Sequence, residues 1–139
     1  MDEKTRKAIF KEIEKEPFGK KFGLRLVDVQ AGYAKVEMRF TQDLENMFGM
    51  AHGGAIFSLI DAAFEIASNS HGTMAVALNM NINYLASPEK GAMLSAKAKE
   101  INRTKKTAVY NIEVRDEQNK LIASCQSIVY RLEKPLPFL

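Results

Sequence analysis

The chain has 139 residues, of which 46% are hydrophobic and 27% are charged. At roughly 150 residues per domain, this length predicts a single domain over residues 1–139, with the composition of an ordinary folded protein. The only cysteine, Cys125, excludes an intrachain disulfide framework and a cysteine-based zinc cluster, and we expect no metal. No segment approaches about eighteen uninterrupted apolar residues, and the acidic start lacks an apolar signal segment. We therefore expect a cytoplasmic protein without a membrane partner.

The formal net charge of +3 is mildly basic. It predicts no nucleic-acid partner, because such proteins concentrate positive charge on one face. One segment, residues 97–106, does carry a local excess of positive charge. It contains Lys97, Lys99, Arg103, Lys105 and Lys106 against Glu100. A small anionic ligand is therefore to be sought there, and the alternative is a solvated strand–turn–strand edge.

The first part of the chain predicts a short helix followed by a hairpin. Residues 4–16 place apolar side chains at helical spacing among charged ones and stop before Pro17, which indicates an amphipathic helix. Residues 22–30 and 33–41 alternate apolar and polar side chains and are joined through Ala31-Gly32, which is typical of a β-hairpin.

The longest helix candidate, residues 55–70, contains no proline or glycine. Residues 73–86 then alternate as a strand, and residues 92–102, 106–116 and 120–132 follow as three more strands separated by turns. The order predicts an α+β domain, in which an antiparallel sheet of about six strands wraps one long helix. We expect the last four strands to form a meander.

The long helix is apolar around most of its circumference, and its polar residues gather in one stripe about 100° wide. The stripe consists of Ser58, Asp61, Glu65, Ser68 and Asn69. A helix that is apolar over so much of its surface is enclosed. Its polar stripe must then face a cavity, another subunit or water.

The segment before this helix reads Asn46-Met47-Phe48-Gly49-Met50-Ala51-His52-Gly53-Gly54. Glycines at a helix start let a ligand approach the free backbone N–H groups closely. Those groups, together with the helix dipole, favour developing negative charge. The alternative is that Gly53-Gly54 only makes a sharp entry turn and that His52 is a structural histidine.

The pattern Asn46-x-x-Gly49-x-x-His52-Gly53-Gly54-x4-Leu59-x-Asp61-x-Ala63, followed by a strand ending in Tyr84-Leu85, resembles a known family. It is similar to the hotdog-fold acyl-CoA thioesterases of the phenylacetate-degradation (PaaI-like) type. The predicted element order agrees with that fold over nearly the whole chain. The resemblance implies a hotdog fold with a short N-terminal helix, and hydrolysis of an aryl- or fatty-acyl-CoA. Coenzyme A would be part of the substrate, and no separate cofactor is expected.

The resemblance also implies roles for individual residues. Gly53, with Gly54 beside it at the helix start, would donate its backbone N–H to the thioester carbonyl. Asp61 would be the catalytic carboxylate, acting as nucleophile or as the base that activates water. Asn46 would help to hold the thioester, and His52 would order the loop.

The remaining candidates are substrate-binding residues. Many relatives carry Ser or Thr near the position of Ala77 or Leu78 to fix the attacking water, and here Asn79 is the candidate substitute. Glu65, one turn beyond Asp61 on the polar stripe, is a further candidate. The phosphates of coenzyme A require basic groups, for which the candidates are Arg103, Lys105 and Lys106.

The spacing of Gly53 and Asp61 provides a geometric test of these roles. Eight residues of helix separate them by about 12 Å along the axis. A base must lie within hydrogen-bond reach of its target, directly or through one water, so Asp61 cannot serve a carbonyl held at its own Gly53. Two antiparallel helices in a two-fold homodimer would supply the arrangement twice. The family likewise forms such dimers, commonly paired into tetramers.

Two other functions fit the same fold. A non-catalytic acyl-CoA sensor is one, and the intact Asn46, Gly53 and Asp61 argue against it. A dehydratase acting on acyl thioesters is the other. Such enzymes need a histidine paired with a carboxylate in their own motifs, whereas His52 lies in the thioesterase pattern.

Overall fold

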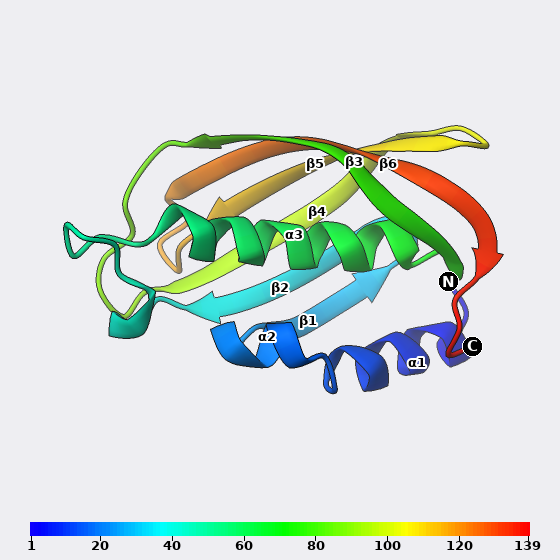
Figure 1. The fold of residues 1–139 in the computed structure, drawn as a ribbon, viewed down its shortest axis with the longest axis horizontal. Helices are drawn as coiled ribbons and strands as arrows, with labels where there is room; N and C mark the ends of the chain where they lie inside the picture. The colour runs from blue at the N-terminus through cyan, green and yellow to red at the C-terminus, as the bar shows by residue number, and fades with distance from the viewer.

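The computed structural model describes residues 1–139 and shows one long helix lying in the concave face of a single antiparallel sheet (Figure 1). The helices are α1 (Glu3–Ile13), α2 (Pro17–Phe22) and α3 (Gly53–Asn69), with a short 3-10 turn at Gln42–Leu44. The strands are β1 (Arg25–Gln30), β2 (Tyr33–Arg39), β3 (Thr73–Tyr84), β4 (Met93–Arg103), β5 (Thr107–Arg115) and β6 (Leu121–Pro135). None of the helices combines the length and hydropathy needed to cross a lipid bilayer.

The N-terminal helix is confirmed, and a second short helix follows it. The side chain of Asp2 caps α1 by accepting a hydrogen bond from the Thr5 N–H at 2.7 Å. Pro17 then begins α2 instead of only ending α1, because proline is well tolerated at the first helical position. Gly23, with φ of 64°, ends α2 in the left-handed region. The first strand therefore starts at Arg25 and not at residue 22.

The strand order is β1-β2-β4-β5-β6-β3, so the predicted four-strand meander is wrong. Strands β4, β5 and β6 do follow one another as hairpins. However, β3 pairs with β6 at the outer edge, and β4 returns to pair with β2. Alternation defines the two faces of each strand but carries no information about its neighbour, so this order had no signature in the pattern.

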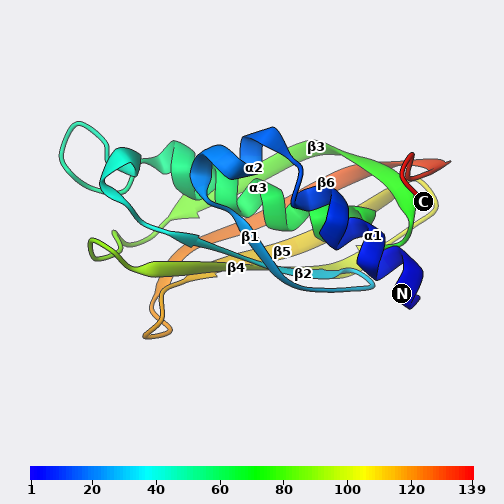
Figure 2. The same ribbon diagram turned by 90° about the horizontal axis from the view of Figure 1, so that it is seen from below.

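The core lies between α3 and the concave face of the sheet (Figure 2). Leu59 and Phe64 of α3 are fully buried, and the Phe64 ring meets the Tyr110 ring edge-on with centroids 5.6 Å apart. Small side chains on the facing strands let the helix approach the sheet closely. They are Ala34, Ala96, Ala98 and Ala108, each at most 1% exposed.

The polar stripe of α3 is narrower than predicted. Ser58 and Ser68 are buried, and their hydroxyls donate to the carbonyls of Gly54 at 2.8 Å and Glu65 at 3.0 Å. A serine that satisfies its hydroxyl on the preceding turn can lie against a core. The outward face of α3 therefore includes Gly54, Phe57, Asp61 and Glu65, and Asn69 at the end of the helix is half-buried.

Candidate active site

The first turn of α3 leaves one backbone donor free. His52 caps the helix through its Nδ1, which accepts a hydrogen bond from the Gly54 N–H at 2.8 Å. The His52 carbonyl accepts from the N–H groups of Ala55 and Ile56. The Gly53 N–H has no acceptor within the chain. It remains available for a ligand at the positive end of the helix dipole.

The two glycines at this helix start differ in how closely their surroundings approach. A Cβ at position 54 would lie 3.0 Å from His52 Nδ1, so a side chain there would disturb the cap. A Cβ at position 53 would lie 3.6 Å from the ring of Tyr84, whose hydroxyl donates to the Gly53 carbonyl at 3.3 Å. Tyr84 therefore shapes the site from β3. In the sequence, Tyr84 stood out only as part of the family pattern, because nothing in the local sequence indicates which strand lies beside a helix start.

Asn46 organises the loop before the helix. Its Oδ1 accepts hydrogen bonds from the N–H groups of Phe48 at 2.9 Å and Met50 at 3.1 Å. The loop carries apolar side chains into solvent, with Met47 90% exposed and Phe48 74% exposed. The Asn46 side-chain oxygen is thus engaged in loop structure, and its NH₂ group is left for a ligand.

Asp61 lies two helical turns further along α3, in a hollow of about 240 Å³ between α3 and the start of β3. The side chain is half-buried and has no ion-pair or hydrogen-bond partner. Burial raises the pKa of Asp61 above its ordinary value. A carboxylate that is partly desolvated and not neutralised is suited to act as base or nucleophile.

Two further carboxylates lie near Asp61. Loss of hydration in the groove raises the pKa of Glu65 to about 7, and the charges of Glu16 and Asp61 add to this shift. Burial also raises the pKa of Glu16, as does the charge of Asp61. Glu16 escaped prediction because it belongs to a charged helical segment that reads as solvated, and only the packing of that segment beside α3 brings it here.

The other predicted site residues lie away from Gly53 within the protomer. Asn79 is exposed in the middle of β3, next to a register shift between Ala77 and Asn79. The basic turn between β4 and β5 lies at the end of the molecule opposite the start of α3 (Figure 1). There Arg103 contacts Glu100 at 3.5 Å and Lys106 pairs with Glu133 at 3.0 Å.

Asp61 and Gly53 also remain apart. The structure keeps α3 helical from Gly53 to Asn69, so the separation of about 12 Å along the axis holds within one protomer. A free N–H donor and an unpaired carboxylate are therefore presented by one rigid helix, too far apart to act on one carbonyl.

Known proteins of one family share the sequence of this chain over most of its length. Residues 48–123 match the family model of the thioesterase superfamily. The chain is 45% identical over 113 residues to a putative esterase of Archaeoglobus fulgidus, covering 81% of this chain and 73% of the relative. It is 34% identical over 119 residues to the acyl-coenzyme A thioesterase PaaI of Escherichia coli, covering 86% of this chain and 85% of that enzyme.

Solved structures show the same likeness. The structure of the E. coli PaaI protein from the phenylacetic acid degradation operon has a TM-score of 0.90 and 32% identity, covering 95% of this chain and 96% of that chain. The structure of smu.793 from Streptococcus mutans, bound to acetyl CoA, has a TM-score of 0.77 and 27% identity, covering 81% and 91%.

The fold and the family match together define a hotdog-fold thioester hydrolase. The chain belongs to the thioesterase superfamily and is a PaaI-like acyl-CoA thioesterase by family. The predicted fold class and enzyme class are confirmed, and relatives in the family are named as hydrolases.

Proposed function

We propose that the protein hydrolyses an aryl- or fatty-acyl-CoA at a site shared by two subunits, where Gly53 of one subunit and Asp61 of the partner subunit act on the same carbonyl. The observation that carries this proposal is the placement of the free Gly53 N–H and the unpaired Asp61 carboxylate on one continuous helix. Their separation of about 12 Å prevents either group from completing the site within its own chain.

The unpaired edge of β3 supports self-association. β3 has 12 residues and pairs only with β6, so its other edge offers a row of backbone donors and acceptors. Exposed apolar side chains lie along β3 and just beyond it: Val76 is 46% exposed, Leu78 60%, Tyr84 51% and Leu85 55%. A protomer left alone would present this edge to solvent. Two-fold pairing of β3 strands would cover it and set two α3 helices antiparallel. A further pairing of such dimers into a tetramer stays a prediction.

The chemistry follows from these positions. The carbonyl oxygen accepts a hydrogen bond from the Gly53 N–H, where the helix dipole stabilises the negative charge that develops on it. In one route, Asp61 takes a proton from water, the water oxygen attacks the carbonyl carbon, and the C–S bond breaks as the sulfur gains the proton. In the other, Asp61 attacks first, expels the thiolate and forms a mixed anhydride, which water hydrolyses. Both routes yield a carboxylic acid and free coenzyme A.

The supporting residues have distinct tasks in this proposal. His52 holds the Gly54 N–H, so that only the Gly53 donor faces the substrate. Asn46 shapes the loop and can offer its NH₂ group, and Asn79 is the candidate for holding water. Coenzyme A as the carrier of the acyl group is supported by the named activity of the E. coli relative and by the acetyl CoA bound in the S. mutans structure. A cytoplasmic location remains a prediction.

The proposal is tested by thiol release from a panel of aryl- and fatty-acyl-CoAs, combined with subunit complementation. Asp61→Asn removes the carboxylate. Gly53→Pro removes the N–H donor, and proline is compatible with the first helical position and with the extended backbone of His52.

Each variant alone should be inactive, whereas a randomly reassembled equal mixture should recover about a quarter of wild-type activity, because half of the dimers hold one intact site. A mixture that stays inactive, although mixed dimers form, would mean that Gly53 and Asp61 of the same subunit act together and that the site is not shared. An active monodisperse monomer in light scattering would exclude the shared site altogether.

A further inference from the structure

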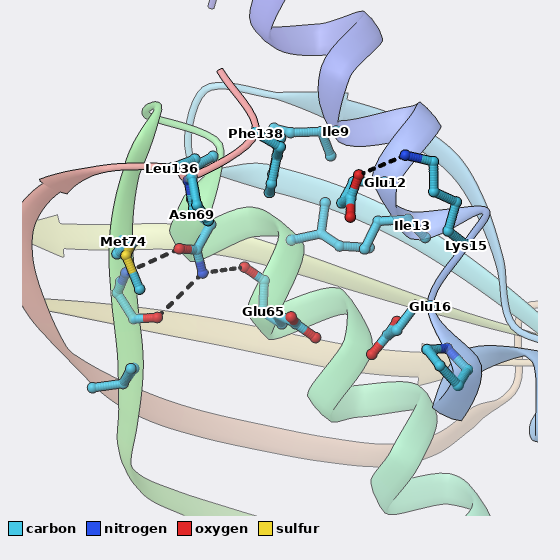
Figure 3. A pocket seen from close by; sticks show the side chains of 15 residues that line it. Ile9, Glu12, Ile13, Lys15, Glu16, Glu65, Asn69, Met74, Leu136 and Phe138 are labelled. Atoms are coloured by element: carbon cyan, nitrogen blue, oxygen red, sulfur yellow. Dashed lines mark hydrogen bonds and ion pairs between the residues drawn. The ribbon is translucent and has the colours of Figure 1, made fainter.

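A second cavity opens beside the hollow that contains Asp61. It lies between α1, α3, the start of β3 and residues 136–138, and its volume is about 470 Å³, within the range of small-molecule sites (Figure 3). Its walls are mainly apolar and include Ile9, Ile13, Ile66, Met74, Leu136 and Phe138. Asn69 fixes one wall, because it bonds both the N–H of Ala75 at 2.9 Å and its carbonyl at 3.2 Å.

The cavity adjoins the proposed catalytic hollow. Glu65, Ala75 and Val76 line both spaces, so the two lie next to each other along α3 and β3. An acyl group whose carbonyl lies at Asp61 would reach the apolar space by passing over Glu65. Phe138 extends into the cavity from the C-terminal segment, on the side of α1, and limits its length there (Figure 3).

Two carboxylates in the wall of the cavity have no positive partner. The side chains of Glu65 and Glu16 face each other across the space between α3 and α1 (Figure 3), and neither forms an ion pair. The one cation in the wall, Lys15, is engaged with Glu12 at 3.1 Å. Burial raises the pKa of both carboxylates, and the negative charge of Asp61 raises each further, with Glu16 adding to the shift of Glu65.

We propose that this cavity receives the distal part of the acyl group, and that Glu65 restricts the substrate to acyl groups without negative charge. The inference rests on the proposed function and specifies its substrate class: uncharged, apolar acyl chains or rings, with acyl groups that end in a carboxylate excluded. Apolar walls favour such groups through burial, and the carboxylates in the wall repel an acyl group that carries its own carboxylate.

The charge selection is tested with a matched pair of substrates, octanoyl-CoA and the same acyl chain ending in a carboxylate, at pH 8, where Glu65 is ionised. The wild type should prefer the neutral chain by about 10- to 100-fold in kcat/KM. Glu65→Gln should reduce this ratio by about three- to tenfold, because Glu16 still contributes repulsion. Glu113→Gln, an equal change of charge on the exposed surface of β5, is the control and should leave the ratio unchanged.

The position of the acyl chain is tested through its length. Phe138 is 38% exposed, so Phe138→Ala should leave folding intact while it lengthens the cavity. The ratio of kcat/KM for dodecanoyl-CoA to that for octanoyl-CoA should rise several-fold. Phe18→Ala, a change of the same kind at a 50% exposed phenylalanine of α2, should leave the ratio unchanged.

The outcomes separate this inference from the proposed function. Turnover that depends on Asp61, with equal rates for neutral and charged chains and no effect of Phe138→Ala, would overturn the acyl cavity and leave the thioesterase site standing. If Glu113→Gln changed the ratio of kcat/KM as much as Glu65→Gln does, Glu65 would act only through the net charge of the protein and not through its position. Absence of turnover with every thioester would overturn the proposed function and this inference with it.

Discussion

The carboxylates of Asp61 and Glu65, on the outward face of α3, differ in their surroundings from the carboxylate of Glu100. On the outward face, Asp61 and Glu65 have no partner, and the pKa of each is raised, mainly by burial. Beyond the end of the helix, Glu100 accepts a hydrogen bond from the Tyr110 hydroxyl at 2.7 Å and lies 2.7 Å from His71 Nε2. Burial alone would raise the pKa of Glu100, but the hydrogen bonds from Tyr110 and His71 and the nearby positive charges hold it below its ordinary value.

The difference distinguishes a carboxylate available for chemistry from one used for structure. Asp61 and Glu100 are both partly buried, so burial does not separate them. The Glu100 carboxylate is engaged in hydrogen bonds with Tyr110 and His71, which link β4 to β5 and to the segment after α3. Asp61 keeps its lone pairs free, as a base or nucleophile must.

The largest expected effect comes from Asp61→Asn. Asparagine is nearly isosteric with aspartate but cannot act as base or nucleophile at neutral pH. We expect kcat to fall by about 10²–10⁴-fold, the usual contribution of general base catalysis, with folding and assembly unchanged. Steady-state thiol release and light scattering measure both parts. A folded, dimeric variant with nearly wild-type turnover would defeat the mechanism and make Glu65 the next candidate.

Glu100→Gln should lower stability and leave activity nearly unchanged, which is the reverse of the effect expected for Asp61→Asn. It removes charge-assisted hydrogen bonds in a mostly buried network and should lower the free energy of unfolding by about 1.5–3 kcal/mol at pH 7. Because the folded pKa of Glu100 lies below its unfolded value, this stabilisation is present above the unfolded pKa and is lost as pH falls through the folded one. Denaturant unfolding at pH 7 and at acid pH checks this, and kcat should change less than a few-fold.

Glu65→Gln should affect stability with the opposite sign. The pKa of Glu65 rises from 4.5 to about 7 in the fold, so the folded state binds more protons than the unfolded state between these values. Stability contributed by Glu65 is then present below its unfolded pKa and is lost as pH rises through about 7. The variant should gain about 1 kcal/mol over wild type at pH 8, since solvent screening limits the effect. An equal gain at pH 4 would contradict this assignment.

The smallest expected effect concerns the basic turn next to Glu100. If Arg103, Lys105 and Lys106 contact coenzyme A phosphates, neutralising all three should raise KM a few-fold and change kcat less. Added salt should reduce the difference, because these charges are exposed and screened. An unchanged KM at low salt would mean that coenzyme A lies elsewhere and that the turn is a solvated edge.

The sequence by itself determined the features that depend on local spacing. The period of residues 55–70 predicted α3, and the interval from Gly53 to Asp61 set their separation along it, because helix geometry has a fixed rise per residue. The motif around these residues predicted the family, and the element order predicted an α+β sheet around one helix.

Only the tertiary structure decided which distant segments meet. It placed β3 at the sheet edge, Tyr84 beside Gly53, and Glu16 with Phe138 around the cavity next to Asp61. It also gave Glu100 its partners and left Glu65 without any. The physical reason is that pairing, burial and pKa depend on contacts between residues far apart in the chain, whereas periodicity reports only on neighbours within a few residues.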